Sequence, residues 1–98
     1  MKITKIIWSV EVVDKIKQKH NVERHEVEDV IFDTTGRTRF FFVEKGHRKG
    51  EDVYTAMGRT GAGRYLIVPF IYKPDQEAGL ILSAREMTET EKKRYEKK

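Results

Sequence analysis

The apolar residues in the first third of the chain recur at helical spacing. Ser9, a favoured N-cap, precedes a segment at residues 10–20 that predicts an amphipathic helix with a cationic outer face. Its apolar positions are Val12, Val13 and Ile16, and its lysines are Lys15, Lys17 and Lys19. Asn21 follows, a residue that tolerates the left-handed conformation found at helix ends. A second helix fits residues 23–32, and the Asp-Thr-Thr-Gly sequence at residues 33–36 ends it.

From residue 40 onward the pattern is that of β-strands joined by short turns. Pro69 interrupts the longest apolar stretch, and because proline cannot donate to a sheet ladder it favours an edge strand or a bulge there. We therefore expect an antiparallel sheet of four strands. The four apolar stretches are residues 40–43, 53–57, 65–72 and 80–83.

The C-terminal segment begins with the T-x-x-E pattern of a capping box, at Thr88 and Glu91, and predicts a final helix. The short apolar segment at residues 2–8 is expected to be extended. The complete expectation is a single α+β domain over residues 1–98, with two N-terminal helices, a four-stranded antiparallel sheet and a C-terminal helix.

Composition excludes several classes of protein. Twenty Lys and Arg residues outnumber sixteen Asp and Glu residues, and the net charge of +4 suits either an anionic partner or a well-charged surface. The absence of cysteine excludes disulfides and thiolate metal sites. No apolar run approaches the ~18 residues of a membrane span, and the N-terminal apolar run is too short for a signal peptide, so we expect a cytoplasmic protein with no membrane partner.

The motifs of metal and nucleotide sites are missing. The three histidines, His20, His25 and His47, lack ligand-like spacing with carboxylates, so we expect no metal and no cofactor. The glycine-rich segment at residues 58–63 precedes a strand instead of a helix, which favours a hairpin turn over a phosphate-binding loop.

Basic residues remain as the candidate chemistry. Five of them outnumber two acidic residues between positions 45 and 64, and the tail from Thr88 has five basic residues against three acidic ones. Such clusters would neutralise phosphates, and equally they would form a solvated surface. The basic residues of the first cluster are Lys45, Arg48, Lys49, Arg59 and Arg64.

Two residues have both a structural and a functional interpretation. His20 closes the first helix, where the macrodipole stabilises an imidazolium, but an imidazole also suits acid–base work on a phosphodiester. Arg85 follows an apolar strand, where an unpaired guanidinium is costly, so it requires a carboxylate or a phosphate. Glu51, Asp52 and Glu86 are the candidate carboxylates.

Several separated segments of the chain form a recognisable set. They are IW at 7–8, KHNV at 19–22, EVEDVIF at 26–32, GR at 58–59, GRYLIV at 63–68, SAREMT at 83–88 and EKKRY at 91–95. Each segment is short, but in their common order and spacing over most of the chain they resemble the BrnT family of bacterial toxins.

This resemblance implies a RelE-like fold and a ribonuclease toxin that a cognate antitoxin, encoded beside it, binds and neutralises. It also implies cleavage without a metal, in which the ribose 2′-hydroxyl attacks the phosphate, a base takes its proton and an acid protonates the leaving oxygen. At the matching positions, Lys19 or His20 would be the acid–base group, and Arg85, Arg59 and Arg64 would stabilise the phosphate. RNA and the antitoxin are the implied partners, and the protein would oligomerise through the antitoxin.

The chain departs from the family pattern at two positions. Val53 stands where many members carry an arginine, and Leu80 where many carry a basic residue shortly before the Ser-Ala-Arg sequence. Arg48 and Lys49, just upstream of Val53, are the candidate substitutes. The alternative function is a non-catalytic module of the same fold that binds a partner protein or a nucleic acid.

Overall fold

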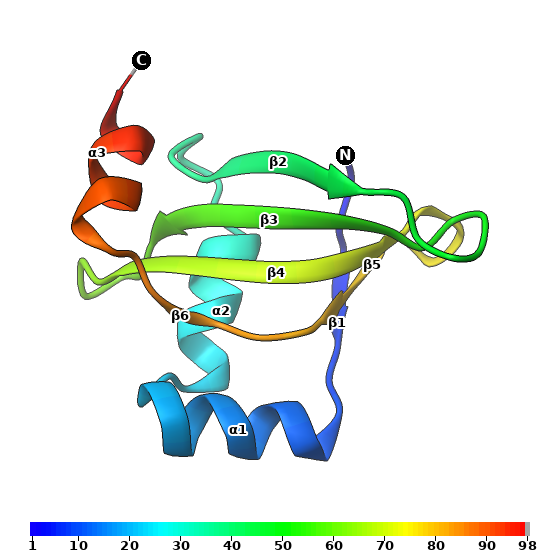
Figure 1. Ribbon diagram of the computed structural model, residues 1–98, viewed down its shortest axis with the longest axis horizontal. Helices are drawn as coiled ribbons and strands as arrows, with labels where there is room; N and C mark the ends of the chain where they lie inside the picture. The colour runs from blue at the N-terminus through cyan, green and yellow to red at the C-terminus, as the bar shows by residue number, and fades with distance from the viewer. Residues whose placement is uncertain (98) are drawn as a thin grey trace.

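The computed structural model describes residues 1–97, which form three α-helices and a mixed β-sheet (Figure 1). The helices are α1 (Val10–His20), α2 (Arg24–Ile31) and α3 (Glu89–Glu96). The strands are β1 (Lys5–Ile7), β2 (Arg39–Glu44), β3 (Asp52–Arg59), β4 (Tyr65–Lys73), β5 (Ala78–Ile81) and β6 (Arg85–Glu86). A single 3₁₀ turn in this part of the chain, Pro74–Gln76, links β4 to β5.

Over the described residues the sheet has six strands in the order β1-β5-β4-β3-β2, with β6 paired to β4. The predicted α+β class is confirmed, and the four predicted strands are present as β2 to β5, which pair antiparallel. The prediction of a purely antiparallel four-stranded sheet is wrong, because β1 pairs parallel with β5 and β6 adds a further partner for β4. β1 lies in the segment at residues 2–8 that is expected to be extended, but its parallel pairing is not apparent from the sequence, and β6, with two residues, is too short for a strand pattern to be recognised. The last predicted strand, residues 80–83, begins two residues earlier and ends at Ile81.

Pro69 lies in β4, which is a central strand and not an edge. β5 pairs with the residues of β4 that follow the proline, and β6 pairs with the residues that precede it. Between these two pairings, the three residues 82–84 lie opposite the two residues 68–69, which makes the pairing irregular. The carbonyl of Pro69 accepts a hydrogen bond from the N–H of Leu82 at 3.0 Å, so the side on which proline lacks an N–H faces this irregularity. Of the two predicted settings for the proline, the bulge is confirmed.

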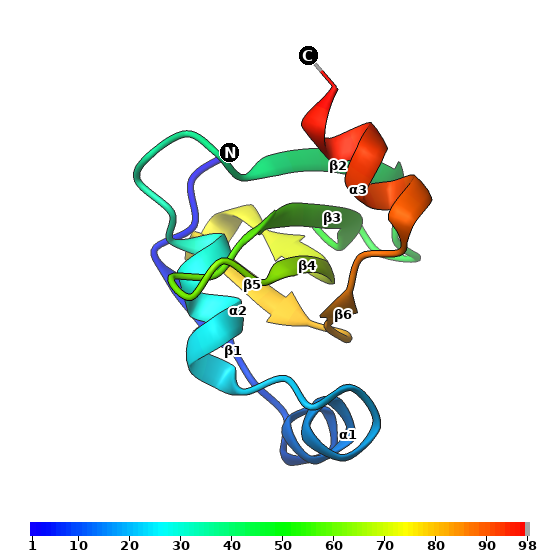
Figure 2. The same ribbon diagram turned by 90° about the vertical axis from the view of Figure 1, so that its left-hand side faces the viewer.

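The core lies between α2 and one face of the sheet (Figures 1 and 2). Along β4 the residues alternate, so that Leu66, Val68 and Phe70 are fully buried against the helix while Ile67 and Ile71 face the other way and are half-buried. We call this second side the open face. Figure 2 shows α1 and α2 on one side of the sheet and α3 on the other. The buried cluster consists of Ile16, Val22, Val27, Val30, Ile31, Ala56, Leu66, Val68, Phe70, Ile81 and Ala84.

The helix boundaries agree with the predicted capping residues. The hydroxyl of Ser9 accepts from the first turn of α1, and Asn21 adopts the left-handed conformation at its end, with φ of 53°. Thr88 and Glu91 form the predicted capping box of α3, in which each side chain bonds the backbone of the other. Local sequence signals therefore set where each of these helices begins or ends.

α1 is attached to the sheet by a lysine that the sequence pattern placed on the outer face. The Nζ of Lys15 donates to the carbonyl of Leu82 at 2.8 Å, in a partly buried contact. This carbonyl lies in the irregular segment between β5 and β6, so the lysine satisfies an acceptor in the segment where the strand pairing is interrupted.

We predict that a methyl group at Gly58 destabilises the fold, because β3 passes close to α2 there. A Cβ would lie 2.5 Å from Oγ1 of Thr38 and 3.1 Å from Cγ1 of Val30. The Thr38 hydroxyl is held by a 2.7 Å hydrogen bond to the Val30 carbonyl, so it cannot move aside without breaking that bond. Gly58→Ala should lower the free energy of unfolding by about 1–3 kcal/mol in urea denaturation followed by circular dichroism.

Gly61→Ala is the matched control for this substitution. A Cβ at Gly61 would meet only the flexible carboxylate end of Asp29, at 3.3 Å. An equal loss of stability in the two variants would contradict the steric explanation.

Candidate functional site

Three of the predicted site residues line one open cavity of about 560 Å³ at the C-terminal end of α1. Lys19 and His20 belong to the last turn of α1, and Arg85 belongs to β6. α1 ends beside β6, so residues that are distant in the sequence meet at this point. The rest of the lining consists of Gln18, Asn21, Glu86 and Thr88.

The guanidinium of Arg85 is held by Glu91. Nη1 donates to Oε1 of Glu91 at 2.7 Å and Nη2 donates to Oε2 at 2.9 Å, while Nη1 also donates to the carbonyl of Glu86 at 3.1 Å. The prediction that Glu51, Asp52 or Glu86 supplies the carboxylate partner of Arg85 is therefore wrong. A guanidinium has five N–H groups, so the Nε–H and one Nη2–H, which lie along one edge, have no acceptor within residues 1–97. The side chain as a whole is 41% exposed.

This ion pair favours the charged form of both partners. The hydrogen bond from Arg85 lowers the pKa of Glu91 to about 2, although burial acts in the opposite direction. The same contact raises the pKa of Arg85 above its ordinary value. Glu91 also accepts from the N–H of Thr88 at 2.8 Å, so one carboxylate serves both the arginine and the start of α3.

Arg64 connects the segments that surround the cavity. Its Nη1 donates to both carboxylate oxygens of Glu26, at 2.8 and 2.9 Å, and to the carbonyl of Asn21 at 2.8 Å. Nη2 donates to the carbonyl of His20 at 3.2 Å, and Nε donates to Oε2 of Glu86 at 3.2 Å. All three nitrogens of Arg64 are thus bonded to protein acceptors, and its geometry is that of a positioning residue and not of a phosphate ligand.

Glu26 is the main charged partner of Arg64 and its side chain is only 12% exposed. Burial alone would raise the pKa of Glu26, but hydrogen bonds from the Glu23 N–H and from Arg64 outweigh it, so the pKa is lowered. The pair therefore remains charged at neutral pH.

Lys19 and His20 differ from Arg64 and Arg85 because their side chains make no hydrogen bond or ion pair with residues 1–97, although the backbone carbonyl of His20 accepts a hydrogen bond from Arg64. Lys19 is exposed and His20 is half-buried. Both groups are available to a ligand in the cavity.

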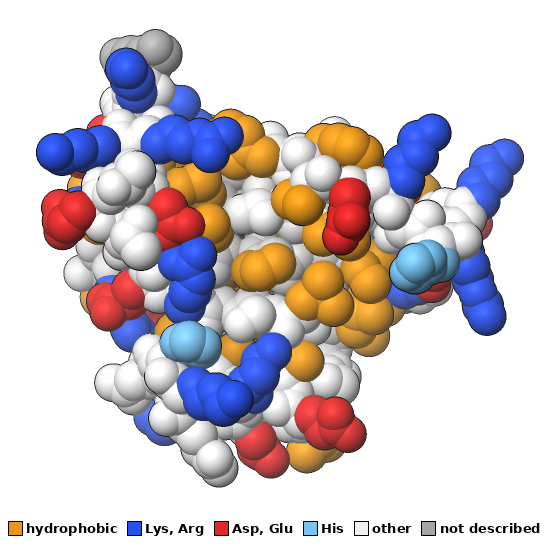
Figure 3. All heavy atoms as spheres, in the orientation of Figure 1, with side chains coloured by type: hydrophobic (Ala, Val, Ile, Leu, Met, Phe, Trp, Pro, Cys, Tyr) orange, Lys and Arg blue, Asp and Glu red, His pale blue; other side chains and the backbone are white. Residues whose placement is uncertain are grey.

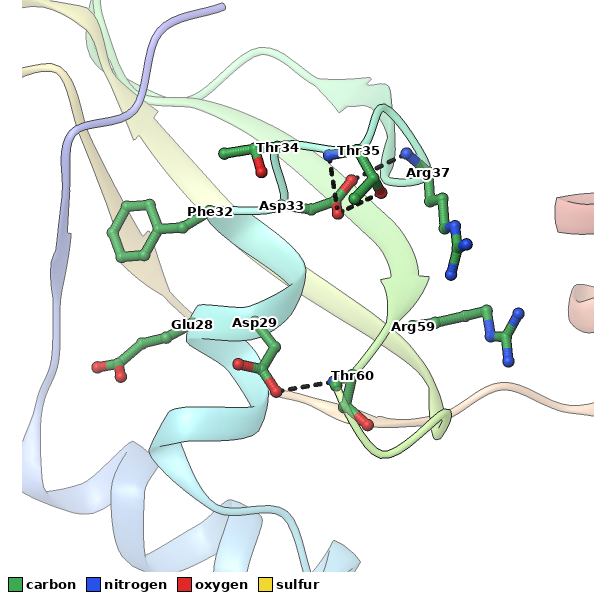
Figure 4. A pocket seen from close by; sticks show the side chains of 10 residues that line it. Glu28, Asp29, Phe32, Asp33, Thr34, Thr35, Arg37, Arg59 and Thr60 are labelled. Atoms are coloured by element: carbon green, nitrogen blue, oxygen red, sulfur yellow. Dashed lines mark hydrogen bonds between the residues drawn. The ribbon is translucent and has the colours of Figure 1, made fainter.

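Arg59 lies at the end of β3, and its guanidinium is 4.9 Å from the ring centre of Tyr65. With Arg37 it lines a second cavity of about 470 Å³ (Figure 4). Figure 4 shows the two arginine side chains extending to the same side, beyond the carboxylates of Asp29 and Asp33. Both carboxylates accept hydrogen bonds from backbone N–H groups of the adjacent loops, Asp29 from Gly61 at 2.9 Å and Asp33 from Arg37 at 2.8 Å. Glu28 also lines this cavity, so its charged lining consists of three carboxylates and two arginines.

Sequence reasoning missed two arginines in this region, Arg37 and Arg39. Together with Arg59 they line a cavity of about 440 Å³ that also includes Tyr65 and Tyr95. The guanidinium of Arg39 lies 5.8 Å from the ring centre of Tyr95. The sequence does contain a signal for this pair. Arg37 and Arg39 are two residues apart at the start of a strand, and residues two apart in an extended chain point to the same side.

Arg48 and Lys49 lie elsewhere. Figure 1 shows the loop between β2 and β3 at the opposite end of the sheet from α3. There the two residues line a small cavity beside the salt bridge between Lys73 and Glu51, which is 3.1 Å long. The structure separates them from the cavity that contains Arg85.

The two departures from the resembled family lie in one row of the sheet. Val53 and Leu80 are both cross-strand partners of Ile71, on the open face. Arg85 is the partner of Ile67, four residues along β4, so about 13 Å separates the two rows. Figure 3 shows apolar side chains over the middle of this face and Lys and Arg side chains at its margins. Val53, Ile71 and Leu80 thus form a continuous apolar row across three strands.

Neither a scan against family models nor a search of curated proteins finds a match to this chain. Within residues 1–97 no helix is long and apolar enough to cross a membrane. The same residues contain no group of three or more His, Asp or Glu side chains arranged to hold a metal ion.

We predict that Arg64→Met lowers the free energy of unfolding by about 2–4 kcal/mol, because the largely buried carboxylate of Glu26 would lose its cationic partner and keep only the Glu23 N–H as a donor. The His20 and Asn21 carbonyls would lose a donor at the same time. Arg48→Met is the control, an exposed arginine whose replacement should change stability by no more than about 0.5 kcal/mol. Urea denaturation of both variants provides the measurement, and similar losses would refute the central role of Arg64.

The ion pair of Glu91 makes stability depend on pH. The pKa of Glu91 is about 2 in the folded protein against an ordinary value of 4.5, so ionised Glu91 stabilises the fold above pH 4.5. This contribution disappears as the pH falls from 4.5 towards 2. Because Arg85 is partly exposed, we expect Glu91→Gln to cost only about 1 kcal/mol at pH 7.

The test is chemical denaturation of the wild type and Glu91→Gln at several pH values. Their difference should narrow as the pH falls towards 2, and Glu89→Gln, an exposed neighbour in the same helical turn, should show no such trend. A difference that stayed constant with pH would mean that the carboxylate charge is not what stabilises this site.

Proposed function

We propose that this protein is a metal-independent endoribonuclease toxin with a RelE-like fold, neutralised by a cognate antitoxin. The observation that supports it is the cavity at the end of α1, where the unoccupied side chains of Lys19 and His20 lie beside the fixed guanidinium of Arg85. Cleavage of a phosphodiester by the neighbouring 2′-hydroxyl needs a proton acceptor, a proton donor and a cation for the phosphate. These three residues offer that combination of groups.

Arg85 would bind the scissile phosphate through its free edge. The Nε–H and the second Nη2–H can donate side by side to two non-bridging oxygens, which is the bidentate geometry that arginine offers to phosphates. Glu91 holds the adjacent edge of the guanidinium, formed by Nη1 and Nη2, so the donors are already oriented before RNA arrives. A preorganised cation stabilises the negative charge that grows on phosphorus oxygens in the transition state.

His20 and Lys19 would carry the protons. The 2′-oxygen forms a bond to phosphorus while the bond to the 5′-oxygen of the next nucleotide breaks. A neutral imidazole at His20 accepts the 2′-hydroxyl proton, and the ammonium of Lys19 donates one to the leaving 5′-oxygen. The products are a 2′,3′-cyclic phosphate and a 5′-hydroxyl, and no redox step or metal is involved.

The apolar row of Val53, Ile71 and Leu80 would affect how RNA is bound more than how the phosphodiester is cleaved. It lies about 13 Å from the row of Arg85, too far for direct contact with the same phosphate. Arg59 pairs with Tyr65, on the other side of Ile67, and is closer to Arg85 along the sheet. RNA would therefore extend from the cavity towards Arg59 and Arg37.

The open face also suits an antitoxin. Its middle is apolar and its margins carry Lys and Arg side chains (Figure 3). A protein segment with apolar residues flanked by carboxylates would complement both features and would cover Arg85. Such a segment is the expected form of the antitoxin contact.

A non-catalytic module that binds RNA or a partner protein is the second candidate. One observation favours it, since Arg85 already has a carboxylate partner in Glu91. In addition, Val53 and Leu80 stand on the open face where the resembled family has cations. A phosphate would meet less net positive charge here than at a free arginine.

We expect the wild-type protein to cleave a short RNA in the presence of a chelator and to leave 2′,3′-cyclic phosphate ends. Arg85→Ala should slow cleavage by about 100-fold or more, because the phosphate would lose its fixed cation. His20→Ala should also slow it by at least about 100-fold, because the 2′-hydroxyl would lose its base. Arg48→Ala removes the same charge far from the cavity and should leave the rate nearly unchanged. Circular dichroism checks that each variant is folded.

The outcomes separate the two candidates. Full activity of Arg85→Ala would contradict the site. Failure of the wild type to cleave RNA at high protein concentration, with RNA binding that weakens steeply as salt rises, would support the non-catalytic module. For a toxin, expression without the neighbouring antitoxin should arrest growth, and expression of Arg85→Ala should not.

A further inference from the structure

The outer strand β2 exposes an apolar edge. Its sequence, RFFFVE, places an aromatic run between a cation and a carboxylate. Phe40, Phe42 and Val43 are 38, 55 and 53% exposed, which is unusual for large apolar side chains in one short strand. Within residues 1–97, β2 pairs only with β3, so the backbone groups along its outer side meet no other strand (Figure 1). An apolar edge of this kind is a template for a further strand.

We propose that β2 pairs antiparallel with β2 of a second copy of this chain, which joins the two sheets across a two-fold axis. The contact lies on the strand edge and not in the cavity of Arg85. The proposal is therefore independent of RNA cleavage.

The pattern of faces along β2 sets the register. A two-fold axis perpendicular to the sheet keeps each face on its own side, so residues that pair across it must belong to the same face. Arg39, Phe41 and Glu44 pair with alternate residues of β3 and so share the open face. With Phe41 on the axis, Phe41 meets its own copy, and Phe40 lies opposite Phe42 of the other chain.

This register also brings opposite charges together. A bulge lies between Phe42 and Glu44, which makes Val43 the extra residue and returns Glu44 to the face of Arg39. Arg39 of one copy then lies near Glu44 of the other, and symmetry repeats this pair at the other end of the strand. The strand is thus complementary to itself in both its apolar centre and its charged ends, and this is why we assign a second copy and not an unrelated strand.

The dimer should be weak. Pairing of two six-residue strands gives a small interface, and each copy carries a net charge of +4 that opposes association. We expect a dissociation constant of roughly 1–100 µM.

Sedimentation velocity of the full chain, freed of nucleic acid, tests the association at concentrations from about 1 µM to 1 mM. The wild type should shift from monomer to dimer over this range, and Val43→Lys should remain monomeric because it places like charges on the edge. Val10→Lys is the control, since Val10 is 78% exposed on α1 and away from β2. A monomer at every concentration, a dimer that survives Val43→Lys, or a dimer that Val10→Lys abolishes equally would overturn the proposal.

Cross-linking tests the register without relying on a destabilising charge. The chain has no cysteine, so a single introduced cysteine can form a disulfide only with its copy. Phe41→Cys should be oxidised to a covalent dimer, because residues opposite each other have Cα atoms within about 5.5 Å. Phe40→Cys should not, because its copy would lie two residues along the strand, at a distance of about 8 Å. Cross-linking of Phe40→Cys with none of Phe41→Cys would overturn the assigned pairing.

Discussion

The hydrogen bonds of Arg64 are the interaction on which the candidate site depends. One guanidinium joins the end of α1, the start of α2 and the short strand β6, through two carbonyls and two carboxylates. None of these segments pairs with the others through a regular ladder, so their relative positions require such a connection. Because the His20 carbonyl is one of the acceptors, the arginine also places the candidate acid–base residue beside Arg85. The free-energy cost of burying the charge of Arg64 is offset by its ion pair with Glu26, which remains ionised.

The distribution of charge on the sheet gives the two ends of the open face different characters. Near α3 the surface carries arginines beside tyrosine rings, with Arg59 over Tyr65 and Arg39 over Tyr95. Around Ile71 the same face is apolar across three strands. The net charge of +4 is therefore a poor description of what a ligand meets, since a polyanion and an apolar segment would contact different rows of one sheet.

Features specified by neighbouring residues were predictable from the sequence, and those that depend on distant partners were not. The three helices and four main strands follow from periodicity, caps and turns, as Ser9 and the Thr88 capping box illustrate. β1 lies in the segment that is expected to be extended, but its parallel pairing with β5 depends on a distant partner. No local pattern marks β6, which pairs with β4. The acceptors of Arg64 come from three separate segments, so its structural role was hidden. The T-x-x-E pattern identifies Glu91 only as a capping residue, although Glu91 is also the carboxylate partner that Arg85 requires.

That double role of Glu91 links the order of the C-terminal helix to the electrostatics of the cavity. The carboxylate can bond Arg85 and the Thr88 N–H together only while the first turn of α3 is formed. Unwinding of that turn would release Arg85 from its orienting partner and increase the positive charge that faces the cavity. Formation of the turn has the opposite effect, giving a less charged but better aligned arginine. If an anion binds at Arg85 as proposed, its binding would be thermodynamically coupled to the first turn of α3, and a partner that orders or unwinds this turn would change the affinity of the cavity without entering it.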